Sequence, residues 1–398
     1  MKAVEAVETE LIKKNNTAFY LFEIGELKRR IGYLREHLPE GTAICYAVKA
    51  NPFLIREISG AVDRLEICSP GEARICSTLG VPTRKMVISG VYKTPEVMEH
   101  MALDNSFHGV FTVESIRQYE LLCGLAVKYG RRFSVLLRLT NQSQFGMDAS
   151  EIESIIAARY DRPDLKIAGI QYFSGTQKKS LKKIKRELDE LDQLLTHLKE
   201  TYGYQAAELE YGPGFPVAYF EEDTFDESSF LSGFSSLLST MQNKPKLILE
   251  IGRSIAASCG RYYTHIVDIK QNGGQNYLIT DGGMHQIVYY GQHMAMKQPA
   301  LSVVGKHTVN DEIPWNICGC LCTMNDIMAK RVFLPDVAVG DTLCFANTGA
   351  YCMTEGISLF LSRELPAIWL LQENGVPVRG RNAAPTELLN TPQYERTE

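Results

Sequence analysis

Reactive side chains of several kinds lie where apolar runs of the sequence end. The run at residues 43–48 is followed at once by Lys49, in the segment YAVKANP. The comparable positions at the ends of other runs are Glu66, Arg138, QYFSGTQ (171–177), GPGFP (212–216) and EIGRS (250–254). Such runs are typical of parallel strands buried on both faces. The carboxyl ends of these strands carry the active site of an α/β barrel, so these positions are candidates for chemistry.

An amine, two glycine turns and a carboxylate together fit one cofactor, pyridoxal phosphate. A lysine forms a Schiff base with its aldehyde, and a carboxylate pairs with its pyridine nitrogen. Backbone N–H groups of Gly212 and Gly214 and the hydroxyl of Thr176 could hold the phosphate, whereas Pro213 has no N–H to offer. Each feature alone is weak, because a strand-end lysine or a Gly-Pro-Gly turn is more often structural. Their joint placement at strand ends predicts the cofactor.

The elements that must position these residues alternate between strand and helix. We expect eight strands, at residues 43–49, 65–69, 86–90, 109–113, 133–139, 167–173, 207–212 and 246–252, with helical stretches between them. Eight such units predict an α/β fold closed into a (β/α)₈ TIM barrel. An open doubly wound sheet is the alternative, but no GxGxxG follows the first strand.

The pattern changes after about residue 257. Segments 261–283, 339–351 and 366–378 each indicate two strands around an Asn-containing turn. We therefore expect a cofactor-binding barrel over residues 24–257 and a β-sandwich or β-barrel domain formed by residues 1–23 and 258–381. Residues 382–398 are polar, and we expect a loosely held tail.

Composition excludes several classes of protein. The chain has 398 residues with 45% apolar and 22% charged residues, as in ordinary globular proteins, and a formal net charge of −5. That charge gives no reason to expect nucleic acid, and no apolar run is long enough for a membrane span. The first residues lack the apolar core of a signal peptide, and ten scattered cysteines favour reduced thiols, so we expect a cytoplasmic location.

One basic run, KKSLKKIKRE (178–187), stands out against this net charge. It leads into leucines at helical spacing, Leu191, Leu194, Leu195 and Leu198. The simplest interpretation is the solvated face of an amphipathic helix.

Six segments in this order resemble the fold-type III pyridoxal-phosphate decarboxylases, the family of diaminopimelate and ornithine decarboxylases. They are YAVKAN, YFSGTQ, YGPGFP, EIGRS, CGCLCTMND and NTGAYCM, and the resemblance extends from about residue 17 to 366. It implies an alanine-racemase-like barrel with a β-domain, in a homodimer whose subunits share active sites. The implied catalytic residues are Lys49 and Cys322. The residues assigned to the cofactor are Lys49, Glu66, Arg138, Phe173, Thr176, Gly212, Gly214, Glu250, Arg253 and Tyr351.

The cysteines of CGCLC need a separate interpretation. Cys318, Cys320 and Cys322 lack the paired spacing of a zinc site, and we expect no metal. On a strand all three would share one face, so at least two would be packing residues. The register of the resemblance favours Cys322 as the general acid.

Departures from the family pattern bear on the substrate. Phe173 stands where the family often has a histidine. Thr323 stands where the family has an acidic residue that pairs with the distal amine of the substrate. Segment 281–293 lacks the arginine by which diaminopimelate enzymes hold a distal carboxylate. The chain is similar to a specialised branch that includes a butirosin-pathway glutamyl-carrier-protein decarboxylase and siderophore-pathway decarboxylases. The resemblance thus favours a conjugated amino acid, free or tethered to a carrier protein, with His285 and His293 as candidates for its pocket.

Other functions remain open at this point. One is decarboxylation of free diaminopimelate, and another is amino-acid racemisation. Racemases of this fold place an arginine at the pyridine nitrogen, whereas this chain has Glu250. A non-catalytic pyridoxal-phosphate-binding protein is the last alternative, and such proteins are usually a lone barrel without a β-domain.

Overall fold

The computed structural model describes residues 2–308 and 310–394, and the chain divides into two compact units. The barrel unit comprises residues 28–217 and 225–255, and the sheet unit comprises residues 1–27, 218–224 and 256–398. Residues 218–224, expected in the barrel, cluster with the sheet unit because Phe220 bridges to Pro299 and Tyr219 packs on Tyr289. Among the described residues, no helix combines the length and apolar character that a bilayer span needs.

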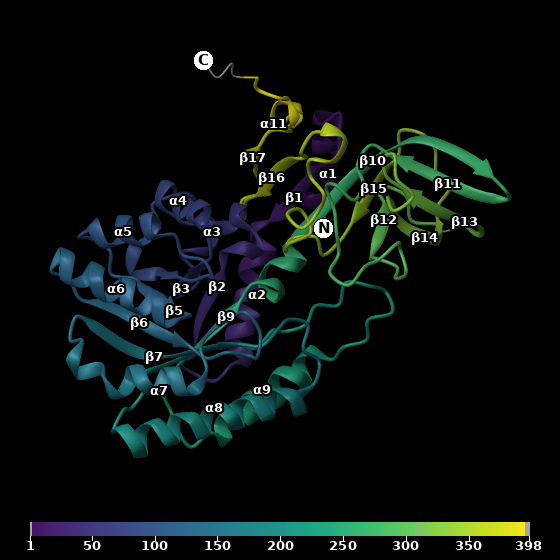
Figure 1. The fold of residues 1–398 in the computed structure, drawn as a ribbon. Coiled ribbons are helices and arrows are strands. Elements are labelled where there is room, and N and C mark those ends of the chain that lie inside the picture. The colour runs from purple at the N-terminus through teal and green to yellow at the C-terminus, as the bar shows by residue number, and fades with distance from the viewer. Residues whose placement is uncertain (1, 309, 395–398) are drawn as a thin grey trace. The chain divides into compact units, whose positions relative to one another are not determined.

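The barrel unit contains a closed parallel barrel of eight strands in sequence order (Figure 1). The strands are β2 (Ala43–Ala47), β3 (Arg64–Ile67), β4 (Met86–Ile88), β5 (Val110–Val113), β6 (Phe133–Arg138), β7 (Leu165–Phe173), β8 (Glu208–Gly212) and β9 (Lys246–Ile251). The barrel closes where β2 pairs with β9, with Cys45 opposite Glu250. The eight strands and the TIM-barrel class predicted from the apolar runs are confirmed.

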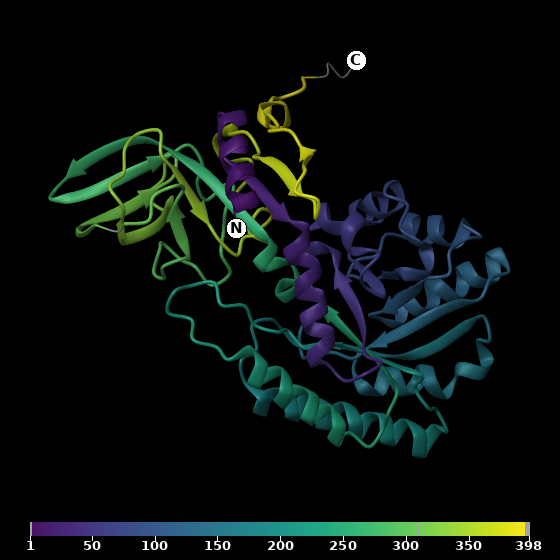
Figure 2. The same ribbon diagram turned by 180° about the vertical axis from the view of Figure 1, so that it is seen from behind.

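Helices follow the strands around the barrel. They are α2 (Ile24–His37), α3 (Ile55–Ile58), α4 (Pro70–Thr78), α5 (Pro95–Leu103), α6 (Ile116–Tyr129), α7 (Ala149–Ala157), α8 (Leu181–Tyr202), α9 (Glu227–Thr240) and α10 (Arg253–Ala256). Short 3₁₀ turns lie at Val48–Ala50, Pro52–Leu54, Thr83–Lys85 and Arg159–Asp161. A serine starts the long helix α8, where the Ser180 hydroxyl accepts the Lys183 N–H. Helices α8 and α9 lie side by side in both views (Figures 1 and 2).

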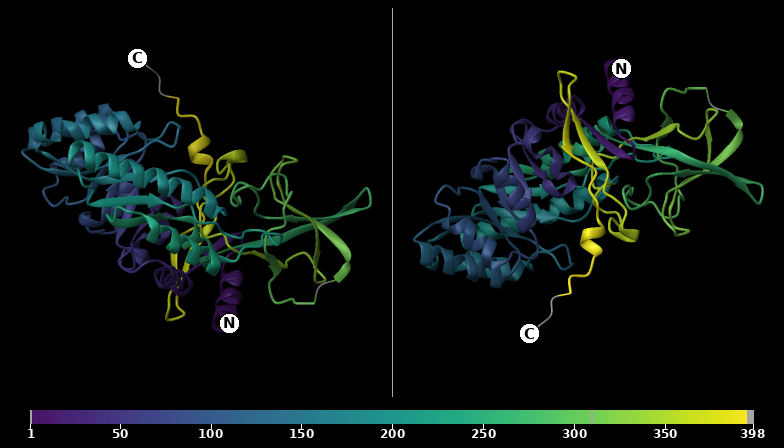
Figure 3. Two further views of the ribbon diagram at one scale, coloured as in Figure 1. Left: turned by 90° about the horizontal axis from the view of Figure 1, so that it is seen from below. Right: turned by 90° about the horizontal axis from the view of Figure 1, so that it is seen from above.

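The sheet unit is built on a nine-stranded mixed sheet. Its strands are β1 (Phe19–Glu23), β10 (Gly260–Asn272), β11 (Gln275–Thr280), β12 (Leu301–Val303), β13 (Asn310–Cys318), β14 (Ile327–Leu334), β15 (Thr342–Phe345), β16 (Ala367–Leu371) and β17 (Pro377–Arg381). Its helices are α1 (Lys2–Lys14) and α11 (Glu387–Asn390), with 3₁₀ turns at Ala257–Cys259 and Phe360–Ser362. Figure 3 shows β10 and β11 as a long hairpin, as the Asn-Gly turn predicted.

The N-terminal segment joins this sheet through β1, which pairs antiparallel with β10 and parallel with β16. Helix α1 packs Leu11 against a cluster that includes Phe19, Tyr263 and Trp369. A buried Glu8 carboxylate fastens the helix, accepting a hydrogen bond of 2.6 Å from the Tyr263 hydroxyl. The charged start of the chain is therefore a folded part of the sheet unit.

Two expectations about this unit need correction. Segment 366–378 holds the start of a hairpin, but segment 339–351 contributes the single strand β15. The chain then turns at Asn347 and Tyr351, which have positive φ of 57° and 66°. Of the three cysteines in CGCLC, Cys318 alone lies in a strand, so the shared strand face does not exist.

The expected polar tail is also partly folded. It carries α11, and the fully buried Thr386 donates a hydrogen bond of 2.7 Å to the Arg363 carbonyl. An isolated bridge between Leu365 and Ala384 adds a further attachment. The last part of that tail, residues 395–398, lies outside the described residues.

Candidate active site

Lys49 lies on the 3₁₀ turn that follows β2, at the carboxyl end of the barrel. Its Nζ is 2.7 Å from Glu66 Oε2 and 3.6 Å from Glu250 Oε1. The rest of the motif shapes this turn, since Asn51 accepts the Phe53 N–H and the Tyr46 hydroxyl donates to the Asn51 carbonyl. Pro52 starts the next turn, and prolines are favoured at such starts. The sequence thus folds into a kink that leaves the amine half-exposed between two buried carboxylates.

The two carboxylates differ in their affinity for protons. Burial raises the pKa of Glu66, but the Lys49 ammonium and hydrogen bonds outweigh this and lower it to about 2. Burial and the charge of Glu66 raise the pKa of Glu250 to about 7. Gln171 on β7 donates a hydrogen bond of 2.9 Å to Glu250 Oε2 and fixes its orientation. Glu66 is thus the lasting anion beside Lys49, and Glu250 is the carboxylate whose charge responds to its surroundings.

The two glycine turns predicted to hold a phosphate touch each other. A Cβ built on Gly214 would lie 2.1 Å from the Gly175 carbonyl oxygen, so this close approach requires glycine. The Lys178 N–H donates to the Gly214 carbonyl at 2.9 Å. A Cβ on Gly212 would lie 2.3 Å from the Phe173 ring, which places the strand-end aromatic against the second turn.

A cation adjoins these turns. Arg253, at the start of α10, donates from Nε to Thr176 Oγ1 at 3.1 Å. A hydroxyl, a guanidinium and two touching turns therefore come together from three predicted segments, 171–177, 212–216 and 250–254. Such a combination suits a phosphate dianion.

Behind the turns, α8 is fixed by a buried ion pair. Lys178 Nζ lies 2.7 Å from Glu187 Oε2, and Glu187 also accepts hydrogen bonds from Ser174 and Tyr211. Burial lowers the pKa of Lys178, and the carboxylate of Glu187 opposes that shift. The pair joins the first glycine turn, β8 and α8. The sequence showed Lys178 as part of a basic run and gave no sign that it pairs with Glu187.

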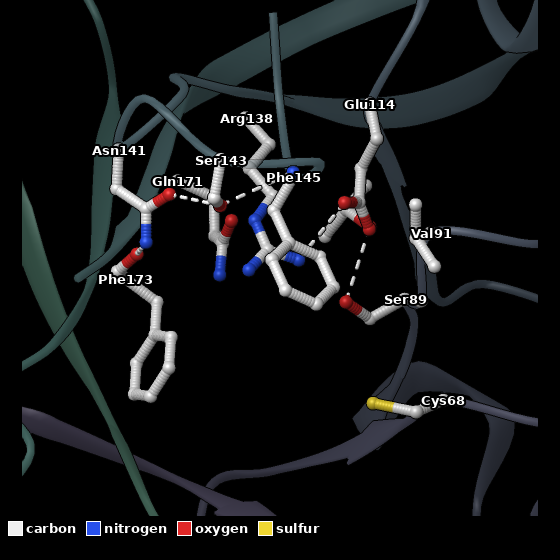
Figure 4. A network of polar contacts seen from close by, with 12 residues as sticks. Cys68, Ser89, Val91, Glu114, Arg138, Asn141, Ser143, Phe145, Gln171 and Phe173 are labelled. Atoms are coloured by element: carbon white, nitrogen blue, oxygen red, sulfur yellow. Dashed lines mark hydrogen bonds and ion pairs between the residues drawn. The ribbon is translucent and has the colours of Figure 1, made fainter. Parts of the chain in front are cut away.

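Arg138 belongs to a second polar cluster, shown in Figure 4. Its Nη1 lies 3.0 Å from Glu114 Oε2, and its guanidinium lies over the Phe145 ring at 4.9 Å from the centroid. Lys93 Nζ is 3.7 Å from the same Glu114. Arg138, grouped with the cofactor residues from the sequence, is thus paired mainly within its own cluster. Figure 4 also shows Phe173, whose carbonyl accepts a hydrogen bond from Asn141.

The remaining predicted residues lie in the sheet unit. Cys322 is exposed and Thr323 half-buried at the tip of the loop between β13 and β14. Asp326 holds this loop, accepting the Met284 and Leu321 N–H groups at 2.7 and 2.8 Å. A Cβ on Gly283 or Gly319 would lie 2.5 or 2.2 Å from that carboxylate, which explains the glycines of DGG and CGC.

Tyr351 and the histidines have different surroundings within the same unit. Tyr351 is half-buried at positive φ, two residues after Gly349, where a Cβ would lie 1.9 Å from the Ala256 carbonyl oxygen. His285 is buried, and burial together with the charge of Arg363 lowers its pKa to about 4, so it is neutral near pH 7. His293 is exposed.

Comparison with known proteins now decides the family. The model described as "Pyridoxal-dependent decarboxylase, C-terminal sheet domain" matches residues 19–349. The chain belongs to the pyridoxal-dependent decarboxylases. It is therefore a carboxy-lyase that acts on amino acids with pyridoxal phosphate as its cofactor.

Curated relatives of this decarboxylase differ in their substrates. It is 27% identical over 364 residues to diaminopimelate decarboxylase of Aquifex aeolicus, covering 86% of this chain and 84% of the relative. It is 26% identical to the L-glutamyl-[BtrI acyl-carrier protein] decarboxylase of Niallia circulans, with 94% and 93% covered. It is 24% identical to the 2-[(L-alanin-3-ylcarbamoyl)methyl]-2-hydroxybutanedioate decarboxylase of Staphylococcus aureus, with 94% and 99% covered.

The fold of the decarboxylase also matches a solved structure. A crystal structure of an Aquifex aeolicus protein has a TM-score of 0.81 at 26% identity, with 96% of this chain and 92% of that chain covered. The combination of an eight-stranded barrel with a sheet domain is therefore that of the family.

The barrel residues of the decarboxylase fit its cofactor on chemical grounds. A half-exposed amine lies between two buried carboxylates, and a guanidinium and hydroxyl adjoin two touching glycine turns. Residues to which the sequence assigned no role complete this arrangement: Cys68, whose Sγ lies 3.6 Å from Lys49 Nζ, and Gln171, Lys178 and Glu187. Of these, Gln171 could have been found, because it is two residues before Phe173 on the same predicted strand and therefore on the same face.

The buried ion pair behind the glycine turns gives one prediction. Glu187→Gln leaves the Lys178 ammonium buried without its anion, so we expect a loss of about 3–5 kcal/mol in stability and weaker retention of the cofactor. Thermal unfolding and equilibrium dialysis against pyridoxal phosphate would measure both. Asp189→Asn on the same helix is the control, because its exposed pair with Lys185 should contribute less than about 1 kcal/mol. Equal effects of the two substitutions would contradict the assignment.

A buried carboxyl inside the barrel gives a second prediction. Glu210 on β8 is fully buried, and burial and the charge of Glu250 raise its pKa to about 8, although Arg64 Nη1 lies 3.5 Å away. Because the folded state holds this proton more tightly than the unfolded state, its contribution to stability is lost as pH rises from about 4.5 to 8. Glu210→Gln should remove a slope of roughly 1.4 kcal/mol per pH unit.

Urea unfolding of the cofactor-depleted protein at several pH values between 5 and 8 would test this. Glu190→Gln, at an exposed position of α8, is the control and should leave the slope unchanged. If wild type and Glu210→Gln lose stability in parallel as pH rises, Glu210 does not carry the proton.

Proposed function

We propose that this decarboxylase removes the α-carboxyl group of a conjugated amino acid, one whose distal end is a neutral amide or thioester. The supporting observation is the loop that carries Cys322. The position after the cysteine is the neutral Thr323, and the nearest acid along the chain, Asp326, is buried with its carboxylate engaged by two backbone N–H groups. The loop therefore offers no carboxylate that is ready to pair with a distal ammonium. An unpaired ammonium in a closed site would cost several kcal/mol.

We assign roles to the chain's own residues as follows. Lys49 would bind the aldehyde of the cofactor covalently, and its amine would then leave Glu250, because the aldehyde and the pyridine nitrogen lie at opposite ends of the ring. Glu250 would pair with the pyridine nitrogen, whose positive charge would lower the pKa of that carboxyl and keep it ionised. Thr176, Arg253 and the glycine turns hold the phosphate, and Phe173 and Tyr351 contact the cofactor.

Bound pyridoxal phosphate supplies the ring that accepts the electrons released as carbon dioxide leaves. Cys322 would donate the proton that replaces the carboxyl group at the α-carbon. The Thr323 hydroxyl would donate a hydrogen bond to the carbonyl oxygen of the amide or thioester of the substrate, or accept one from the amide N–H. His285 would be a neutral residue of the same pocket.

Two relatives support a conjugated substrate, since their names specify a carrier-bound glutamyl group and a carbamoyl-linked alanine. Diaminopimelate decarboxylases of several organisms are also among the relatives and support the alternative, a free amino acid. A panel of free, amide-linked and carrier-loaded amino acids, with carbon dioxide and product mass as readouts, separates the two. Release of carbon dioxide from free diaminopimelate or ornithine at rates on the order of 1–10 s⁻¹ would refute the proposal.

A substitution at Thr323 tests the same proposal from the side of the enzyme. Thr323→Asp adds the missing carboxylate, so activity toward ornithine should rise while activity toward the conjugated substrate falls, each by roughly tenfold or more. Thr323→Asn is the control, because it has similar size to Asp without the charge. A rise in ornithine turnover with both variants, or with neither, would show that this position does not read the distal group.

We also propose that the enzyme is a homodimer with shared active sites, in which the loop of Cys322 and the segment of Tyr351 serve the barrel of the other subunit. The resemblance of the CGCLCTMND and NTGAYCM segments to those of the family supports this arrangement.

A further inference from the structure

Helix α8 begins with a dense group of exposed cations in a chain of net charge −5. Five of the eight residues 179–186 are basic, and all five are exposed. We call this group the basic turn; it consists of Lys179, Lys182, Lys183, Lys185 and Arg186. The function proposed so far gives these residues no role.

The basic turn goes against the usual charge preference of a helix. Partial positive charge accumulates at a helix N-terminus, so cations there are unfavourable and carboxylates are favourable. Eight of the described helices follow the rule, each with a glutamate in its first turn: α1, α2, α3, α4, α5, α7, α9 and α11. Helices α6 and α10 have no acid there. Helix α8 has no acid in its first turn and has Lys182 and Lys183 there instead. Departures from local preferences, such as cations at a helix N-terminus, are expected at functional sites. Here the charges of the lysines and the positive end of the helix dipole add to one positive electrostatic potential.

The cations are presented outward. Ile184, Leu188 and Leu191 form the buried face of α8, and Lys182 and Arg186, four residues apart, lie on the opposite face. Acids appear only after the basic turn, where Asp189 pairs with Lys185 and Glu190 with Arg186. The positive charge is therefore concentrated at the very start of the helix.

That start lies beside the predicted cofactor site. The basic turn begins three residues after Thr176, and Lys178 between them is bonded to the Gly214 carbonyl and paired with Glu187. The buried pair fixes the first turns of α8 to the barrel. This attachment lies at the carboxyl end of the barrel strands, which is also the end where Lys49 lies. Figure 1 shows α8 following β7 along the outside of the barrel. An anionic partner bound there would be held at the rim of the barrel that carries Lys49.

We propose that the basic turn docks an acidic carrier protein that delivers the amino acid as a thioester. The inference rests on the proposed function and names the partner for it. Complementary charge accelerates encounter and selects the partner, which is what a carrier presenting a tethered substrate needs. A membrane surface is a poorer fit because the apolar face of α8 is buried in the fold, and nucleic acid needs a longer basic stripe.

The test uses charge reversal at the basic turn: Lys182→Glu, Lys183→Glu and Arg186→Glu together in the full-length, cofactor-loaded enzyme. Acids are favoured at a helix N-terminus, but Arg186→Glu loses its pair with Glu190 and faces it with a like charge. Thermal unfolding and cofactor content of the variant are therefore compared with those of wild type before activity is measured. The control reverses three exposed cations elsewhere on the barrel unit, Arg132→Glu, Lys166→Glu and Lys199→Glu, for the same change in net charge.

Two substrates separate docking from chemistry. One is an acidic acyl carrier protein loaded with L-glutamate, and the other is the pantetheine thioester of the same amino acid. For the reversed variant we expect kcat/KM with the loaded carrier to fall roughly tenfold to a hundredfold, with the small thioester unchanged. Binding of fluorescently labelled carrier should weaken in parallel, and only wild type and the control should lose affinity steeply between 50 and 300 mM salt.

Other outcomes overturn the inference in distinguishable ways. Equal losses for the reversed variant and its control, or equal losses with carrier and small thioester, would mean that the basic turn is not a docking surface. Turnover of the small thioester with no preference for the carrier would overturn docking and leave the proposed function standing. Turnover by wild type of neither thioester, nor of any amide-linked amino acid, would overturn the proposed function itself. Binding of a DNA duplex or of phosphatidylserine vesicles in place of the carrier would assign the surface to another anion.

Discussion

Lys49→Ala should reduce decarboxylation by at least about a thousandfold and abolish covalent retention of the cofactor. The amine of Lys49 lies 2.7 Å from Glu66 and 3.6 Å from Glu250, and its side chain keeps 38% exposure. No other group in the described part of the barrel combines an accessible amine with two carboxylates in this way. Removing it takes away the covalent anchor while leaving the glycine turns intact, so weak non-covalent binding of the cofactor should persist.

Lys93 is the best rival, because burial lowers its pKa to about 8 and an amine with a lowered pKa is the better nucleophile. Its surroundings argue against it. The Lys93 side chain keeps 2% exposure, and its Nζ donates to the Gly90 carbonyl and to Gln118 Oε1 at 2.7 and 3.0 Å. An aldehyde would have to break these bonds to reach it.

Borohydride reduction of the loaded enzyme followed by peptide mapping decides between the two lysines. The adduct should lie on the peptide that contains Lys49, and Lys93→Ala should keep both the adduct and most of the activity. An adduct on Lys93, or an undiminished adduct in Lys49→Ala, would refute the assignment of Lys49 as the covalent anchor of the cofactor.

The barrel could be predicted from the sequence because its signal is local. Each strand is a short apolar run. In a strand such as β2 all five residues are buried, so no polar face interrupts the apolar run. The motif residues Lys49, Thr176, Gly214 and Glu250 follow from strand order alone, because parallel strands bring their carboxyl ends to one rim.

The missed features depend on contacts between distant residues. Glu8 can be buried because Tyr263 and Arg261, more than 250 positions away, donate hydrogen bonds to its carboxylate. Asp326 shapes the Cys322 loop through Met284 and Leu321, and nothing in the local sequence marks it as buried. The segment CGCLC leaves the strand after Cys318, where the Gly319 and Leu321 N–H groups donate to Asp326 instead of to a neighbouring strand. Polar residues paired over long distances leave no periodic trace in a sequence.

Mixing two inactive variants should restore activity if subunits share their sites as proposed. Lys49→Ala removes the covalent anchor in the barrel unit, and Cys322→Ala removes the proton donor in the sheet unit. In a symmetric dimer with shared sites, a mixed dimer has one site with both lesions and one site with neither. Random exchange of equal amounts makes half of the dimers mixed, so about one quarter of wild-type activity should return.

The measurement follows carbon dioxide release after the two variants are mixed, with native mass spectrometry confirming that subunits have exchanged. A matched control mixes Lys49→Ala with Glu250→Gln, because both lesions lie in the same barrel and no combination of chains yields a site free of both. That mixture should stay inactive. Recovery near one quarter for the first mixture and none for the second would require that Lys49 and Cys322 of one site come from different chains. No recovery in either mixture, with exchange confirmed, would mean that each chain completes its own site, and the loop of Cys322 would then have to serve the barrel of its own subunit.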